Sequence, residues 1–103
     1  MINEQILREG GLKHYPFFDT IAAIPAVKAI YLYGSRAKGD FDDWSDIDLL
    51  IDCPDMSGWG DVREVAATTT LLVDIECTRL QDVKDEVFKA QLEKYRKPLY
   101  AKH

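Results

Sequence analysis

Two aspartates separated by a single residue occur in an apolar segment near the middle of the sequence, Ser45-Asp46-Ile47-Asp48-Leu49-Leu50. If the segment is a strand, Asp46 and Asp48 project from one face, about 6.5–7 Å apart at Cα. Carboxylate oxygens suit Mg²⁺, which commonly takes one or two of them together with substrate phosphates. The pair therefore predicts a magnesium site, and a solvent-facing strand with an acidic outer face is the alternative.

A third carboxylate, Asp74, interrupts a later apolar segment, Leu71-Leu72-Val73-Asp74-Ile75-Glu76. If this segment is a strand beside the first one, Asp74 completes a cluster of three carboxylates. Glu76 would lie on the same face and is the rival for this position. A charge that protects an edge strand from aggregation is the structural alternative.

Gly34 and Ser35 directly follow another apolar segment, Ala29-Ile30-Tyr31-Leu32-Tyr33. Glycine allows backbone conformations and close approaches that other residues do not. A helix that begins at Ser35 would direct unpaired backbone N–H groups at the turn, which is a favourable arrangement for phosphate oxygens. A Gly-Ser pair alone is more often a plain turn, so the prediction depends on its combination with the carboxylates.

The elements that must position these residues follow from apolar periodicity and from glycine and proline breaks. We expect helices at 3–9, with Asn3 as N-cap, and from Pro16 to about Ile24, and a short helix near Ser35. Strands are expected at 28–33, 46–52 and 71–77, and another helix at 57–67. A final helix capped by Asp82 should end at Pro98, with one apolar stripe formed by Val83, Val87, Phe88, Leu92 and Tyr95. This order predicts a small mixed sheet flanked by helices, an α/β or α+β fold.

Composition limits the classes of function. The chain has 103 residues, which predicts a single domain over 1–103, and its formal net charge is −5. Nucleic acid is bound mainly through Lys and Arg, so an acidic chain is not expected to bind it. No apolar run is long enough to span a membrane and no signal peptide is visible, so we expect a cytoplasmic protein without membrane contact.

Other reactive side chains form no recognisable site. Cys53 and Cys77 fit no zinc pattern and are expected to be reduced, partly buried thiols; His14 and His103 stand alone. Gly34 and Gly39 have the spacing of a P-loop, but Asp40 and Phe41 follow where Lys and Ser or Thr are required. A P-loop NTPase and a histidine- or cysteine-based hydrolase are therefore excluded.

Taken together, Gly34-Ser35-Arg36-Ala37-Lys38-Gly39 and Ser45-Asp46-Ile47-Asp48-Leu49-Leu50 resemble the signature of the DNA polymerase β-type nucleotidyltransferases. Val73-Asp74-Ile75 resembles the third acidic position of that superfamily, and the short chain is similar to its minimal nucleotidyltransferase (MNT) branch. The resemblance runs from about Tyr31 to the C-terminus. It implies the polymerase β-type nucleotidyltransferase fold.

The resemblance also implies a role for each matching residue. Gly34 and Ser35 would hold the triphosphate of ATP, and Arg36 and Lys38 would contact phosphates or else lie in solvent. Two Mg²⁺ ions would be bound by Asp46 and Asp48, and Asp74 would share the catalytic ion and help to deprotonate the attacking hydroxyl. Two ions in such a site activate the hydroxyl and stabilise the leaving pyrophosphate.

The chain offers no additional domain that would hold an acceptor, so the acceptor is expected to dock from outside. MNT proteins are commonly paired with a HEPN-domain toxin, and the resemblance implies an antitoxin that transfers AMP from ATP to a tyrosine of that partner. The alternative is a non-catalytic antitoxin that acts only by binding its partner.

Overall fold

A four-stranded mixed sheet, with the strand order β3-β2-β1-β4, forms the centre of the molecule. The computed structural model describes residues 1–102; His103, which the sequence leaves as an isolated histidine, lies outside them. Strands β1 (Ala29–Tyr33) and β2 (Ile47–Asp52) are antiparallel neighbours, β4 (Lys97–Ala101) is antiparallel to β1, and β3 (Ile75–Arg79) is parallel to β2. The predicted mixed sheet flanked by helices is confirmed.

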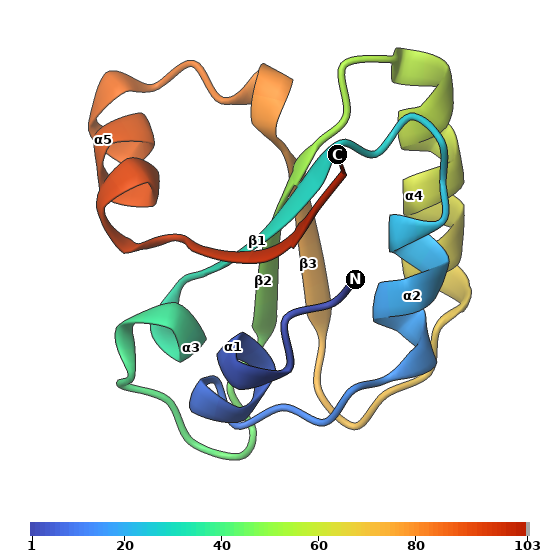
Figure 1. Ribbon diagram of the computed structural model, residues 1–103. Coiled ribbons are helices and arrows are strands. Elements are labelled where there is room, and N and C mark those ends of the chain that lie inside the picture. The colour runs from blue at the N-terminus through green and yellow to red at the C-terminus, as the bar shows by residue number, and fades with distance from the viewer. Residues whose placement is uncertain (103) are drawn as a thin grey trace.

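The helices lie on both sides of this sheet (Figure 1). They are α1 (Glu4–Glu9), α2 (Pro16–Ala22), the short α3 (Ser35–Lys38), α4 (Met56–Thr68), a 3₁₀ turn η1 (Leu80–Asp82) and α5 (Glu86–Tyr95). Helices α2 and α4 pack together on one side, whereas α5 stands on the other. No helix in residues 1–102 is long and apolar enough to cross a membrane.

Local sequence explains why these elements begin where they do. Asn3 accepts the N–H groups of Gln5 and Ile6 as the N-cap of α1, as predicted. Pro16 occupies the first turn of α2, where a missing N–H costs nothing. The apolar faces of the helices and strands form one core, whose largest fully buried side chains include Phe18, Leu7, Ile21, Ile30, Leu32, Ile47, Leu49, Ile51 and Leu99.

Helix α4 is the crossover between the parallel strands β2 and β3, which cannot be joined by a tight hairpin. The third strand, predicted at 71–77, therefore begins four residues later than predicted. Leu71 to Asp74 form the return from α4, with Leu72 90% exposed, and β3 begins only at Ile75.

The C-terminal elements also differ from the sequence prediction. Asp85, not Asp82, caps α5 by accepting the N–H groups of Val87 and Phe88, while Asp82 pairs with Arg79 at 2.8 Å. The helix ends at Tyr95, and Pro98 lies inside strand β4, which the sequence prediction missed. An edge strand tolerates proline because one side of it needs no hydrogen-bond donor.

Candidate active site

The turn between β1 and α3 adopts a conformation that requires glycine. Gly34 has φ 73° and ψ −155°, a combination that side-chain-bearing residues almost never adopt. Its carbonyl accepts the N–H groups of Ala37 and Lys38, which closes the turn onto α3. The predicted short helix at Ser35 is confirmed, and Ser35 is its first residue, directly beside this turn.

Gly34 also makes room for a carboxylate of the neighbouring strand. A Cβ added to Gly34 would lie 2.3 Å from Oδ2 of Asp48, so the carboxylate rests directly against the glycine. The pairing of β1 with β2 explains this contact, since Tyr33 and Asp48 are register partners at the end of the ladder. The fold thus brings the predicted phosphate turn and a predicted metal ligand together, although they are far apart in sequence.

The carboxylates occupy two successive levels of the parallel β2–β3 pair. Glu76 is the register partner of Asp48. Continued by one residue beyond Ile47 and Ile75, the same register places Asp74 beside Asp46, just before the two strands begin. Asp48 and Glu76, as register partners, therefore share one face of the sheet, and the charge of Asp46 also acts on Asp48.

Close packing of like charges perturbs Asp48. Partial burial, then the negative charges of Glu76 and Asp46, and a hydrogen bond with Glu76 raise the pKa of Asp48 to about 6. A carboxylate pair that lacks a counter-ion favours the protonated form of one partner, whereas a cation favours both charged forms. The arrangement therefore has the chemistry of a cation-binding site.

The two rivals for the third carboxylate lie in different surroundings. Glu76 interacts with Asp48 directly. Asp74 is exposed, its backbone carbonyl accepts the N–H of Ile47 at 2.8 Å, and it borders a hollow of about 340 Å³ beside the end of α4. Among residues 1–102, no three His, Cys, Asp or Glu side chains are grouped closely enough to form a metal site by themselves. Any bound Mg²⁺ must therefore draw further ligands from substrate or solvent.

Arg36 neither faces the predicted phosphate site nor lies in solvent; its side chain is buried and bonded to backbone carbonyls. Its side chain is only 3% exposed. Its guanidinium donates to the carbonyls of Gly10 at 2.8 Å and of Ser45 at 2.9 and 3.1 Å, and more weakly to those of Asp42 and Asp43. Arg36 thereby fixes the loop between α3 and β2, which leads directly to the carboxylates.

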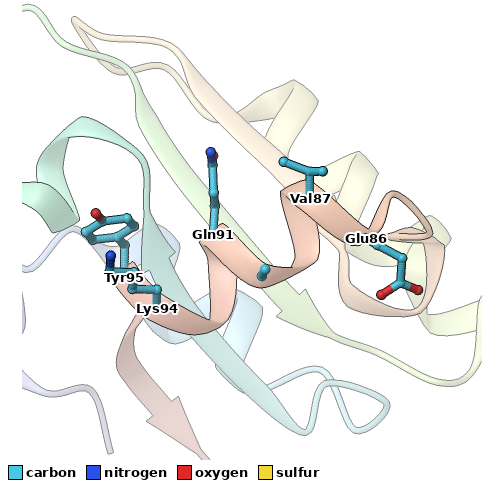
Figure 2. Close-up of a pocket in the computed structure, with 6 residues that line it drawn as sticks. Glu86, Val87, Gln91, Lys94 and Tyr95 are labelled. Atoms are coloured by element: carbon cyan, nitrogen blue, oxygen red, sulfur yellow. The ribbon is translucent and has the colours of Figure 1, made fainter.

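Lys38 is exposed and reaches over α5, with Nζ 5.0 Å from the centre of the Tyr95 ring. On α5 itself, Nζ of Lys94 lies 5.3 Å from the same ring. Figure 2 shows Lys94 and Tyr95 together at the C-terminal end of this helix. Two cations therefore stand on the α5 side of Gly34 while the carboxylates stand on the β2 side, an arrangement suited to a metal-bound polyphosphate.

A small cavity lies between the turn and α5. Its volume is about 160 Å³, and its lining includes Gly34, Lys38, Tyr33, Phe88 and Tyr95. The aromatic residues of α5 belong to the apolar stripe expected from the sequence. In the structure, Leu92 is the one buried residue of α5, while Val87 is 71% exposed.

Comparison with known proteins is consistent with this geometry. The family model for polymerase beta nucleotidyltransferases matches residues 19–103. The chain belongs to this family. A comparison with curated protein sequences gives no match.

Several solved structures share the nucleotidyltransferase fold. A toxin-antitoxin crystal structure with AMP-PNP has a TM-score of 0.64 at 23% identity, over 88% of this chain and 76% of that chain. The toxin-antitoxin MntA-HepT has a TM-score of 0.56 at 19% identity, over 97% and 74%. A protein described as a nucleotidyltransferase from Sulfolobus solfataricus has a TM-score of 0.58 at 24% identity, over 96% and 86%. At these identities the likeness concerns the fold.

Proposed function

We propose that this nucleotidyltransferase transfers AMP from ATP to a hydroxyl group of a partner protein, in a reaction that depends on Mg²⁺. The observation that carries the proposal is the contact between Gly34 and the carboxylate of Asp48. Because of this contact, a turn suited to binding phosphate lies directly beside carboxylate oxygens suited to binding Mg²⁺.

The donor set fits the proposed metal. Asp46 and Asp48, with Asp74 or Glu76 as the third carboxylate, would offer hard oxygen atoms, and burial together with the charges of Glu76 and Asp46 raises the pKa of Asp48. When bound, Mg²⁺ would lower the pKa of the acceptor hydroxyl and neutralise charge on the triphosphate. Two ions are proposed, as in related two-metal sites.

The residues of the chain would then act mainly by positioning the substrates. Gly34 and Ser35 hold the triphosphate, and Lys38 attracts its negative charge. The acceptor oxygen forms a bond to the α-phosphorus, the bond from that phosphorus to the bridging oxygen breaks, and pyrophosphate leaves. The acceptor proton passes to the third carboxylate. Positioning and electrostatic stabilisation supply most of the rate in reactions of this kind.

The acceptor is proposed to be a tyrosine on a HEPN-domain toxin, which makes this chain an antitoxin. Support comes from the toxin-antitoxin assemblies among the structures with the same fold, one of which was crystallised with AMP-PNP. A phenol ionises more readily than an aliphatic hydroxyl, which favours tyrosine at a metal-assisted site. The acidic loop with Asp40, Asp42 and Asp43 would attract a basic partner surface.

Incubation with Mg²⁺-ATP and a candidate HEPN-domain partner, read by intact mass and peptide mapping, tests the proposal. An AMP-sized adduct on a partner tyrosine is expected with wild type and should be absent with Asp48→Asn. Asp61→Asn, an exposed change on α4 outside both the carboxylate cluster and the acidic loop, is the matched control and should retain transfer. A partner that binds tightly but remains unmodified, while the chain binds ATP, would instead identify an antitoxin that acts by binding alone.

A further inference from the structure

The cavity beside Gly34 has an aromatic lining that phosphate binding does not require. Tyr33 from β1 and Phe88 from α5 meet edge to face, with ring centres 6.1 Å apart and an interplanar angle of 74°. Tyr95, about two turns after Phe88 on the same face of α5, completes the lining. Triphosphate and Mg²⁺ are polar and charged, so this surface calls for a different part of the ligand.

We propose that this cavity holds the purine base of the nucleotide, with Tyr95 as the ring on which the base stacks. The inference rests on the proposed function, because it places the base relative to a triphosphate bound at Gly34. Gly34 and Lys38 line the cavity themselves, so base and phosphates occupy one continuous site. A stacked base is recognised through its π face, and the large face of a purine makes better use of three aromatic rings than a pyrimidine does.

Gln91 is the polar group best placed to recognise the edge of the base. It lines the cavity and also the outer hollow of α5, which has a volume of about 500 Å³. Figure 2 shows its side chain projecting from the helix between Val87 and Tyr95. Its amide carries both donors and an acceptor, so it can pair with exocyclic and ring nitrogens of a base.

The packing of α5 also indicates that a ligand is needed there. Leu92 is its one buried residue, and the other contacts of the helix with the fold include the Phe88–Tyr33 ring pair and the Lys38–Tyr95 cation–π contact. A base between α3 and α5 would add apolar contacts to a helix that has few of them. Helix α5 should therefore exchange its amide hydrogens quickly in the free protein and more slowly when nucleotide is bound.

Calorimetric titration with two probes separates the base from the phosphates. Mg²⁺-ATP and Mg²⁺-tripolyphosphate are titrated into wild type, Tyr95→Ala and Val87→Ala. Val87 is on the same helix but lines only the outer hollow, so its variant is the matched control. Tyr95→Ala should weaken ATP binding about tenfold or more, the loss typical of one base–aromatic stack, and leave tripolyphosphate binding unchanged. Tyr95→Phe should restore ATP affinity, and wild type should bind ATP more tightly than CTP.

Hydrogen exchange provides the second readout and does not depend on a variant. ATP should protect residues 86–95 of the wild-type protein more strongly than tripolyphosphate does. If wild type binds neither probe, the proposed function itself is contradicted. If it binds both probes, but Tyr95→Ala binds ATP as tightly as wild type, the base site is overturned and the phosphate site stands. Intact ATP affinity with slowed transfer would mean that the cavity takes an aromatic ring of the acceptor instead.

Discussion

Replacing Asp48 by asparagine should stabilise the protein at neutral pH while abolishing nucleotidyl transfer. Asp48 is half-buried, and its pKa is raised from the ordinary value of 3.8 to about 6, first by burial and then by the negative charges of Glu76 and Asp46. Between about pH 4 and pH 6, folding is therefore accompanied by uptake of a proton at Asp48. The stability that this proton confers is fully present below about pH 4 and is lost as pH rises through about 6. Asparagine keeps the size of the side chain and removes the charge.

The expected gain in the free energy of unfolding follows from the change in the pKa of Asp48. About two pKa units correspond to roughly 3 kcal/mol as an upper limit. Water screens much of this repulsion because the carboxyl group is only partly buried, so about 1 kcal/mol is expected in the free energy of unfolding. For a domain of this size, about 1 kcal/mol moves the melting temperature by roughly 4–8 °C.

Urea unfolding of wild type, Asp48→Asn and the control Asp61→Asn, at pH 5 and pH 7.5 without divalent metal, measures this effect. The gain of Asp48→Asn over wild type should be clear at pH 7.5 and smaller at pH 5, where wild-type Asp48 is largely protonated. Added Mg²⁺ should narrow the gap at pH 7.5 by stabilising wild type alone. Equal stability of the two proteins at both pH values, or a loss at pH 7.5, would refute the account of the charge cluster.

Four further substitutions test the turn at Gly34, the packing of α4 and the charges around His14. Gly34→Ala should destabilise the fold and abolish transfer, because Gly34 has positive φ and its added Cβ would collide with Asp48; thermal melting and an AMP-transfer assay measure the two effects. In α4, Gly58→Ala should destabilise, because the new Cβ would lie 2.1 Å from that of Ala26, whereas Gly60→Ala, with nothing within 4 Å, should stabilise by about 0.5–1 kcal/mol in urea unfolding. His14 contacts Glu4 and Asp19, whose hydrogen bonds raise its pKa, so its stabilising effect is present below the unfolded pKa and lost as pH rises past the folded one. His14→Gln should therefore lower the melting temperature more at pH 5.5 than at pH 8.5, and an equal loss at both would contradict this reading.

Local signals were sufficient for the first half of the fold. Asn3, Pro16 and Gly34 each have a conformational preference that depends on few neighbours, so the ends of α1, α2 and β1 could be predicted within about two residues. The alternation around Asp46 and Asp48 likewise identified β2 and its acidic face.

The later elements depend on tertiary contacts that the sequence does not display. Strand β4 contains Pro98 and is short and mixed in character, and it forms only because β1 offers it an edge. The apolar stripe on α5 looks like a core face, yet only Leu92 reaches the core. Apolar periodicity cannot distinguish a stripe that packs against the sheet from one that lines a ligand cavity.

In the candidate site, too, some residues could be identified from local sequence and others only from tertiary contacts. The types and spacing of Gly34, Asp46 and Asp48 could be interpreted from sequence, because they reflect local chemistry. The burial of Arg36 could not, since its partners include the carbonyl of Gly10, distant in the chain. The proximity of Glu76 to Asp48 depends on the register of two parallel strands joined by a whole helix, so the sequence left both Asp74 and Glu76 open.

We propose that the turn at Gly34 and the adjacent carboxylates together bind a metal–nucleotide complex. Calorimetric titration of ATP into wild type and into the double variant Asp46→Asn/Asp48→Asn, with Mg²⁺ and again with EDTA, tests it most directly. Wild type should bind ATP only when Mg²⁺ is present, and the double variant should not bind it, while circular dichroism shows that the variant remains folded. Equal binding of ATP by both proteins, or binding by wild type that is unaffected by EDTA, would contradict it.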